Sequence, residues 1–268
     1  MARDAGQALR VVQFSDSHLF ASTDGKLLGL NTDDSLNRVL DLIEKEQPSV
    51  EIILATGDLS QDASVASYRR LLDKLRRFKA PSYWLEGNHD VTAPMRESLG
   101  SDAVMCPCVI ERGNWSIVML DSTIPYEVPG ELDEGDLAFL EQALDAAKGR
   151  HVMVCLHHHP IPLGCKWLDT QVVNSADRFF EILDRYTNVR AVVWGHVHQE
   201  YEGERNNVNL YSVPSTCVQF KPLSDDFAVD DTAPGYRWFD LYPDGRIDTG
   251  VSRVSGIKFE VDFSVKGY

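Results

Sequence analysis

Seven of the eight histidines in this sequence of 268 residues lie in short clusters with aspartate, asparagine or glycine. In chain order, the clusters are Asp16-x-His18, Gly57-Asp58, Gly87-Asn88-His89-Asp90, His157-His158-His159 and Gly195-His196-x-His198. Carboxylate, imidazole and amide groups are ligands suited to first-row ions such as Mn, Fe or Zn. Each cluster alone is a weak signal, because a lone aspartate after a strand is more often a turn former. Their joint occurrence predicts a metal centre.

Two of these clusters carry ligand residues at alternating positions. Alternating residues of an extended segment project to the same side, so we expect Asp16 and His18 to reach one site. The same spacing predicts that His196 and His198 can reach one site. Asp58 can bridge two ions, because a carboxylate has two oxygens.

A pair of metal ions has a well-defined chemistry. Two ions roughly 3.5–4 Å apart form a clamp for in-line displacement at phosphorus. His89, next to Asn88, is then well placed to protonate the leaving oxygen. The clusters therefore indicate an enzyme that cleaves phosphate esters.

A short apolar run precedes each chemical cluster. These runs are LRVVQF, VEIILAT, PSYWLE, WSIVML, HVMVCL and VRAVVW, and they predict buried strands. Helical periodicity occurs between them, over residues 33–46, 62–78, 133–148 and 174–186. Strands that alternate with helices predict an α/β domain with mainly parallel pairing. Ligands of such domains bind beyond the carboxyl ends of the strands, so we expect the clusters to converge there.

The sequence after Gly195 has a different character. It is rich in aromatic and β-branched residues and contains the turn signal Pro243-Asp244-Gly245. This pattern predicts antiparallel strands over residues 207–265 that complete a second sheet. We therefore expect one domain over residues 1–268, with the metal motifs within residues 14–198.

The net charge of −15, from 26 Lys and Arg against 41 Asp and Glu, limits the partners. Nucleic acid and anionic lipid are polyanions, so we expect neither nucleic acid nor a membrane as a partner. An anionic small molecule would need a local offset, which bound metal cations could supply.

The apolar runs, the N-terminal sequence and the number of cysteines lead to expectations about cellular location and about disulfides. No stretch approaches 18 consecutive apolar residues, and the N-terminal sequence lacks the pattern of a secretory signal. We therefore expect a cytoplasmic protein. The five cysteines are odd in number and irregularly spaced, so we interpret them as buried apolar residues rather than a disulfide framework.

The order D-x-H, G-D, G-N-H-D, H, G-H-x-H resembles that of the calcineurin-like metallophosphoesterase superfamily, over about residues 11–200. The segments SDSHLF, LNTDDSLNRVL, ATGDLSQD, WLEGNHD, LHHHPIPLGCKWLD and PSTCVQF resemble those of bacterial class III 3′,5′-cyclic AMP phosphodiesterases. The resemblance implies an α/β fold, a four-layer α/β/β/α sandwich of two mixed sheets flanked by helices, with a dinuclear centre at one edge.

The resemblance also implies the ligands of each ion. Those of the first ion are Asp16, His18, Asp58 and His198, and those of the second are Asp58, Asn88, His157 and His196. His89 is implied to act on the leaving group, and Asn88, His89, His18 and His198 are implied to contact the substrate. Fe and Mn are the implied metals, with Zn or Co as alternatives.

The activity implied is hydrolysis of 3′,5′-cyclic AMP, or of other cyclic nucleotides, to the 5′-monophosphate by a metal-bound hydroxide. A homodimer is implied by resemblance alone. Alternative substrates are another phosphodiester, a nucleotide pyrophosphate or a phosphomonoester. A non-enzymatic scaffold with this fold is a further alternative, but it would be expected to lose ligands or the histidine at position 89.

The neighbours of the predicted ligands have several interpretations. Asp90 is predicted either to be structural or to orient a motif histidine. The roles of His158, His159 and Asp121 stay open, as does the physiological metal pair. By resemblance, Gln61, Asp62, Trp167 and the PSTCVQF segment line the pocket.

Overall fold

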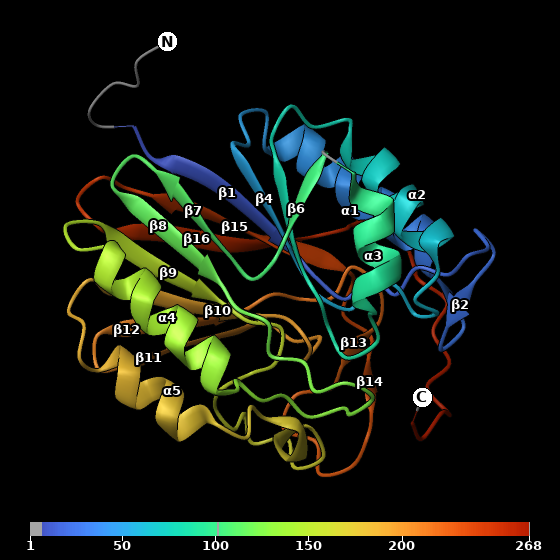
Figure 1. Ribbon diagram of the computed structural model, residues 1–268. Helices are drawn as coiled ribbons and strands as arrows, with labels where there is room; N and C mark the ends of the chain where they lie inside the picture. The colour runs from blue at the N-terminus through green and yellow to red at the C-terminus, as the bar shows by residue number, and fades with distance from the viewer. Residues whose placement is uncertain (1–6, 101, 268) are drawn as a thin grey trace.

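The computed structural model describes residues 7–100 and 102–267 of the chain. Two six-stranded sheets pack face to face, and helices cover the outer face of each sheet (Figure 1). This arrangement confirms the predicted α/β sandwich of two mixed sheets. No helix in the described ranges is both long and apolar enough to cross a membrane.

The first sheet has the strand order β16-β15-β1-β4-β5-β6. Its strands are β1 (Leu9–Phe14), β4 (Ile52–Thr56), β5 (Ser82–Leu85), β6 (Ala103–Met105), β15 (Gly235–Leu241) and β16 (Ile247–Arg253). Strands β1, β4, β5 and β6 are parallel, and the β15–β16 hairpin adds to them in antiparallel fashion.

The second sheet has the order β11-β12-β10-β9-β8-β7. Its strands are β7 (Cys108–Arg112), β8 (Trp115–Met119), β9 (His151–Cys155), β10 (Val189–Trp194), β11 (Tyr201–Arg205) and β12 (Val208–Ser212). The four central strands are parallel, and β7 and β11 are antiparallel edges. Two short hairpins, β2 (Lys26–Leu27) with β3 (Leu30–Asn31) and β13 (Gln219–Phe220) with β14 (Val229–Asp230), lie outside both sheets.

Five α-helices and one 3₁₀ turn connect the described strands. They are α1 (Thr32–Glu46), α2 (Val65–Leu75), α3 (Thr92–Leu99), α4 (Glu134–Ala146), α5 (Ala176–Leu183) and η1 (Leu168–Gln171). Side-chain caps set where three of the helices begin, because Asn31, Ser64 and Asp133 each accept a backbone N–H of the first turn. The prediction for residues 62–78 was therefore too long at its start. Helix α3 was not predicted, because its eight residues show little apolar periodicity.

Three apolar cores separate the four layers. One packs α1, α2 and α3 against the first sheet, and another packs α4 and α5 against the second. The third lies between the sheets, where side chains such as Val11 and Leu54 meet Ile117 and Met153. Four of the five cysteines are buried, as predicted, whereas Cys108 is partly exposed.

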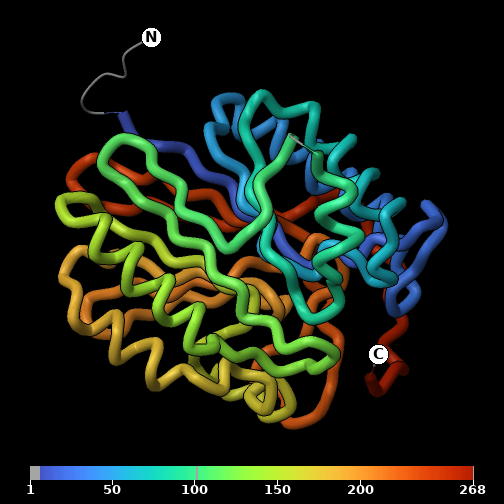
Figure 2. The backbone as a smooth tube through the Cα atoms, in the orientation of Figure 1, coloured from blue at the N-terminus to red at the C-terminus, as the bar shows by residue number. Residues whose placement is uncertain are grey.

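The prediction for residues 207–265 is partly wrong. Within this range, β12 joins the second sheet, but β15 and β16 extend the first sheet, because β15 pairs with β1 at the other end of the chain (Figure 2). Residues 257–265 form no strand. The domain predicted over residues 1–268 also includes residues 1–6, 101 and 268, which lie outside the described residues.

A buried arginine connects the two sheets. Arg237 of β15 is fully buried, and its Nε donates to the carbonyl oxygen of Ser212 at 2.9 Å. Its Nη1 donates to Oε1 of Glu202 on β11 at 2.8 Å. The charge is therefore paired with groups of the opposite sheet, which holds the second sheet in register against the first.

Candidate metal centre

The chemical clusters converge at the carboxyl ends of β1, β4, β5, β9 and β10, as predicted. The loops after β1 and β4 are joined by backbone hydrogen bonds from Asp16 N to Gly57 O and from His18 N to Asp58 O, both 2.9 Å. Space between the loops is tight, since a Cβ on Gly87 would lie 2.3 Å from Asp58 Oδ1. Glycine is therefore required at that position.

The expected extended geometry of D-x-H and G-H-x-H is wrong. Asp16, His18, His196 and His198 all have positive φ angles, of 55°, 45°, 64° and 48°. Asp58 shares this left-handed conformation, with φ of 50°. Such angles are uncommon for residues other than glycine and concentrate at functional sites. As a result, His196 and His198 direct their rings into two different groups of side chains.

The first group contains Asp16, His18 and His198, which are fully buried and whose ligand atoms lie within 4.8 Å of one another. His18 Nε2 lies 3.2 Å from His198 Nε2, which lies 3.4 Å from Asp16 Oδ1. The other ring nitrogens are held from behind. His198 Nδ1 donates to the carbonyl oxygen of Val218 at 2.8 Å, and His18 Nδ1 to Oε1 of Gln61 at 2.7 Å. Such partners orient histidines that bind metals.

The second group contains Asp58, Asn88, His157 and His196. His157 Nδ1 donates to the carbonyl oxygen of Thr56 at 2.8 Å. Its Nε2 lies 3.3 Å from Oδ1 of Asn88 and 3.4 Å from Oδ2 of Asp58. The backbone N–H of His196 donates to the Asp16 carboxylate, at 3.1 Å from each oxygen, which links the two groups.

Asp58 lies between the two groups. Its Oδ2 is 3.8 Å from His18 Nε2 and 3.4 Å from His157 Nε2, and its Oδ1 accepts the backbone N–H of His89 at 2.9 Å. Burial alone would raise the pKa of Asp58, but His157 and His89 outweigh it and hold the pKa well below the usual range. A carboxylate in this position can bridge two cations.

The protonation states of His18 and His157 are also compatible with bound metal cations. Burial lowers the pKa of His18 to about 3, so its ring is neutral, which is the form that binds a metal. Burial opposes protonation of His157 as well, but the Asp58 carboxylate outweighs it and raises the pKa of His157 to about 9. A cation bound by both groups would take the place of the proton that they share.

One buried ring nitrogen in the second group makes no hydrogen bond to the described residues. Nε2 of His196 has no hydrogen-bond partner among the described residues. Leaving a buried polar atom unpaired costs roughly 1–3 kcal/mol, and a bound cation would remove that cost. Together with the buried carboxylates and the facing Nε2 atoms, this atom shows that the residues present fit two metal ions.

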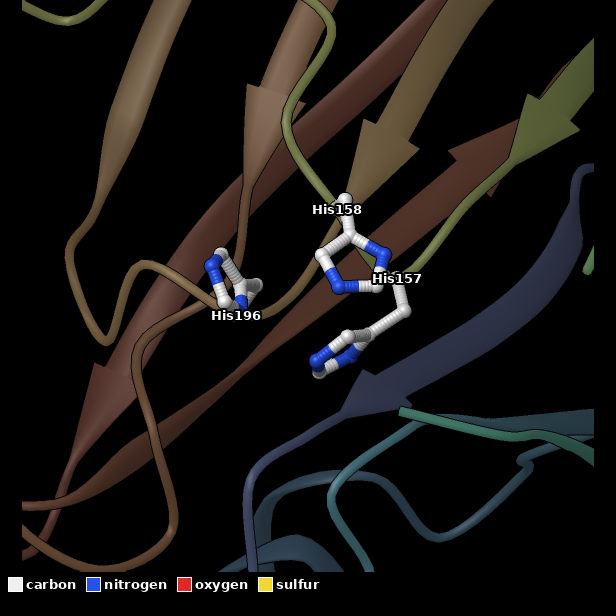
Figure 3. Close-up of side chains that lie close together, drawn as sticks. All are labelled: His157, His158 and His196. Atoms are coloured by element: carbon white, nitrogen blue, oxygen red, sulfur yellow. The ribbon is translucent and has the colours of Figure 1, made fainter. Parts of the chain in front are cut away.

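The three consecutive histidines at positions 157–159 have different roles in the structure. Figure 3 shows the rings of His157, His158 and His196 close together, and their nitrogens also lie within ligand distance of one another. Both nitrogens of His158 are engaged, however, Nδ1 with Ser122 Oγ at 2.9 Å and Nε2 with the carbonyl oxygen of Val128 at 3.1 Å. His158 therefore positions the loop that contains Val128, whereas only His157 presents its Nε2 to Asp58.

The remaining neighbours have structural contacts. The ring of His159 stacks on that of His196, with centroids 5.7 Å apart. Asp121 accepts the backbone N–H and the hydroxyl of Thr123, at 2.9 and 2.7 Å, and so shapes the loop after β8.

Of the two roles predicted for Asp90, its contacts fit the structural one and not the orientation of a motif histidine. Its carboxylate accepts the backbone N–H groups of Leu59, Ser60 and Gly87, at 3.0–3.1 Å, and the hydroxyl of Tyr68 at 2.9 Å. Asp90 thereby fastens the loop after β4 to the loop after β5. It positions Asp58 and Asn88 through the backbone rather than through an imidazole.

Gln61 has a role that its sequence pattern did not reveal. Its Oε1 accepts from His18 Nδ1 at 2.7 Å, and its Nε2 lies 3.3 Å from His89 Nδ1. The amide of Gln61 thus contacts the rings of both histidines. Gln61 therefore orients His89, a contact that depends on the folded loops and not on local sequence.

A cavity of about 370 Å³ adjoins these groups. Its lining residues are Asn88, His89, Tyr126, Glu127, Val128, Trp167, Gln171, His196, Phe220, Phe227 and Gly267. Of the residues expected to line a pocket, Trp167 and the last residue of PSTCVQF do so, whereas Gln61 and Asp62 do not. A larger cavity of about 650 Å³ lies next to residues 257–263, and none of the predicted ligands lines it.

Comparison with known proteins gives a consistent picture. The family described as calcineurin-like phosphoesterase matches residues 9–200. A Pseudomonas aeruginosa protein named 3′,5′-cyclic adenosine monophosphate phosphodiesterase CpdA is 46% identical over 268 residues, which cover 100% of this chain and 97% of that protein. A protein of the same name from Escherichia coli (strain K12) is 41% identical and covers 98% of this chain and 97% of its own length.

A solved structure shares the fold. The dimetal phosphatase from Danio rerio matches with a TM-score of 0.64 and 16% identity, over 93% of this chain and 100% of that one. At this identity the likeness concerns the fold alone. The match over residues 9–200 and the identity to full-length relatives show that this chain belongs to the calcineurin-like phosphoesterase family.

Proposed function

We propose that this protein hydrolyses 3′,5′-cyclic AMP to 5′-AMP with two bound metal ions. The observation that carries the proposal is the position of Asp58 between two groups of buried imidazole and carboxylate ligands, beside a cavity that His89 lines. The cyclic AMP substrate is supported by the names of relatives that are 41% and 46% identical over nearly their full length.

The ligand sets follow the two groups of side chains. The first ion is assigned to Asp16, His18, Asp58 and His198, and the second to Asp58, Asn88, His157 and His196. Fe and Mn are the proposed metals, with Zn or Co as alternatives, because imidazole and carboxylate ligands suit all of these ions. Two ions would supply positive charge for the phosphate and would make the attacking water more acidic.

The residues of the chain supply orientation and a proton. Asn88 and His89 line the cavity, where they can contact the phosphate group. The backbone of His89 is held by Asp58, and its ring by the amide of Gln61. In its imidazolium form, His89 can protonate the 3′-oxygen as the bond from phosphorus to that oxygen breaks and is left as a neutral imidazole. Opening of the ring leaves the phosphate on the 5′-oxygen.

A substrate panel tests this proposal. Purified protein with Mn²⁺ is assayed with cyclic AMP, cyclic GMP, bis-p-nitrophenyl phosphate and p-nitrophenyl phosphate. We expect turnover of cyclic AMP. Turnover of the generic diester or the monoester alone would overturn the cyclic AMP assignment in favour of another phosphoester. No turnover of any substrate by metal-loaded protein would favour a non-enzymatic scaffold. A cytoplasmic location and a homodimer stay predictions.

A further inference from the structure

The cavity beside the metal centre is lined by two chemically different kinds of side chain. Its lining includes the polar side chains of Asn88, His89 and His196 and the aromatic side chains of Trp167, Phe220 and Phe227. The ring centroids of Trp167 lie 5.1 Å from those of both phenylalanines, which are 5.5 Å from each other. We call these three residues the aromatic wall.

Three separate segments build the aromatic wall. Trp167 directly precedes the η1 turn, Phe220 belongs to β13, and Phe227 lies in the loop between β13 and β14. The ring of Phe220 stacks on that of His198, with centroids 4.1 Å apart and planes 9° from parallel. Because His198 belongs to the first ligand group, the aromatic wall adjoins the metal centre.

The aromatic wall is not fully explained by core packing. Phe220 is 2% exposed and belongs to the core around the second sheet, whereas Trp167 and Phe227 are only partly buried and pack at its margin. The indole Nε1 of Trp167 is shielded from solvent and donates to no described residue. Aromatic faces beside a polar centre are suited to a ligand that has both a planar ring and an anionic group.

The charges of the cavity set the direction in which such a ligand would lie. Glu127 also lines the cavity, and its carboxylate would repel a phosphate group. The phosphate therefore belongs beside Asn88 and His89, where cations are proposed. The rest of the ligand then extends toward the aromatic wall. The volume of about 370 Å³ is within the range of roughly 300–1,000 Å³ that is usual for small-molecule sites.

We propose that Trp167 and Phe227, the partly buried members of the aromatic wall, bind the base of the nucleotide by stacking, while the phosphate occupies the metal centre. This inference rests on the proposed function, since it assumes a nucleotide in this cavity. According to this inference, these side chains make the protein bind nucleotides more tightly than phosphate esters that lack a base.

A binding experiment tests the aromatic wall without any turnover. Mn²⁺-loaded protein is titrated calorimetrically with 5′-AMP and with ribose 5-phosphate, which differ only in the base. We expect 5′-AMP to bind more tightly by about 5- to 150-fold, the range that corresponds to stacking of one base on aromatic side chains. Equal affinities for the two ligands in the wild-type protein would overturn the proposal.

Single substitutions test which side chain causes the preference for 5′-AMP over ribose 5-phosphate. Phe227→Leu keeps an apolar side chain but removes the ring, so we expect it to lose at least fivefold of the preference for 5′-AMP. Phe263→Leu is the matched control, because Phe263 is 54% exposed and lines the other cavity. Its preference should equal that of the wild type. If F227L keeps the full preference, the aromatic wall does not bind the base.

The outcome is distinguishable from failure of the proposed function. A protein that prefers 5′-AMP through Phe227 but does not cleave cyclic AMP would refute the proposed activity and support the aromatic wall. A protein that cleaves cyclic AMP but binds both ligands equally would support the activity and refute the aromatic wall.

Discussion

Nε2 of His157 lies 3.4 Å from Oδ2 of Asp58, and both side chains are almost fully removed from solvent. This pair joins a strand end of the second sheet to a strand end of the first. On its other side, the same carboxylate faces His18. The proposed dinuclear centre depends on this arrangement, because one carboxylate must reach two ions.

Substitution of His157 tests whether this histidine, rather than His158, is a metal ligand. His157→Ala should lower the bound metal from two ions per chain to one and reduce cyclic AMP turnover by at least about 100-fold, since loss of even an indirect partner of a ligand costs 10–100-fold. Metal content is measured by plasma mass spectrometry. His158→Ala is the matched control and should retain both ions, because both of its nitrogens bond elsewhere. If H158A lost a metal and H157A did not, the assignment would be wrong.

Substitution of His89 tests the proton donor. His89→Ala should keep its metal and lose about 10²–10⁴-fold in turnover of cyclic AMP, whose leaving alkoxide needs a proton. Turnover of bis-p-nitrophenyl phosphate should fall less, because p-nitrophenolate leaves without one. Steady-state kinetics with both substrates give the comparison. An equal loss for both substrates would contradict the general-acid role.

Gln61 should show the same dependence on the leaving group. Gln61→Ala removes the amide that holds Nδ1 of His89, so kcat for cyclic AMP should fall about 10- to 100-fold, and that for bis-p-nitrophenyl phosphate should change less. Because Gln61 also holds Nδ1 of His18, the double variant with His89→Ala is compared at saturating Mn²⁺, where it should be no slower than H89A alone. Additive losses would show that Gln61 acts through the metal centre instead.

The stability of the sandwich should depend on Arg237. Arg237→Ala leaves the Ser212 carbonyl oxygen without its buried donor, while Glu202, whose side chain is 54% exposed, can be solvated, so the free energy of unfolding should fall by about 1–3 kcal/mol. Guanidinium denaturation at saturating Mn²⁺ measures the change. Arg246→Ala provides the control, because Arg246 is exposed and should alter the stability by no more than about 0.5 kcal/mol. A similar loss in both variants would contradict the role of Arg237.

The sequence predicted the convergence of the clusters because that property follows from strand order alone. Every cluster comes after a buried strand, and the carboxyl ends of parallel strands share one edge of a sheet. The left-handed conformations of Asp16 and His196 were not predictable, since they are imposed by hydrogen bonds between loops far apart in sequence. The same reason hid the role of His158, whose partners, Ser122 and Val128, belong to another loop.

The sheet to which β15 and β16 belong could not be predicted from the local sequence pattern either. The alternation of β15 and β16 is compatible with either sheet, and only the pairing of β15 with β1 decides between them. Aromatic residues over 257–265 suggested a strand, but they lie along the larger cavity without a strand partner.

Metal titration of the enzyme tests the central claim most directly. Metal-free protein is titrated with Mn²⁺ while bound metal and the conversion of cyclic AMP to 5′-AMP are followed together. The account predicts that hydrolysis reaches its maximum at two ions per chain and that 5′-AMP is the sole product. Full activity at one ion per chain, formation of 3′-AMP, or no hydrolysis at two bound ions would contradict it.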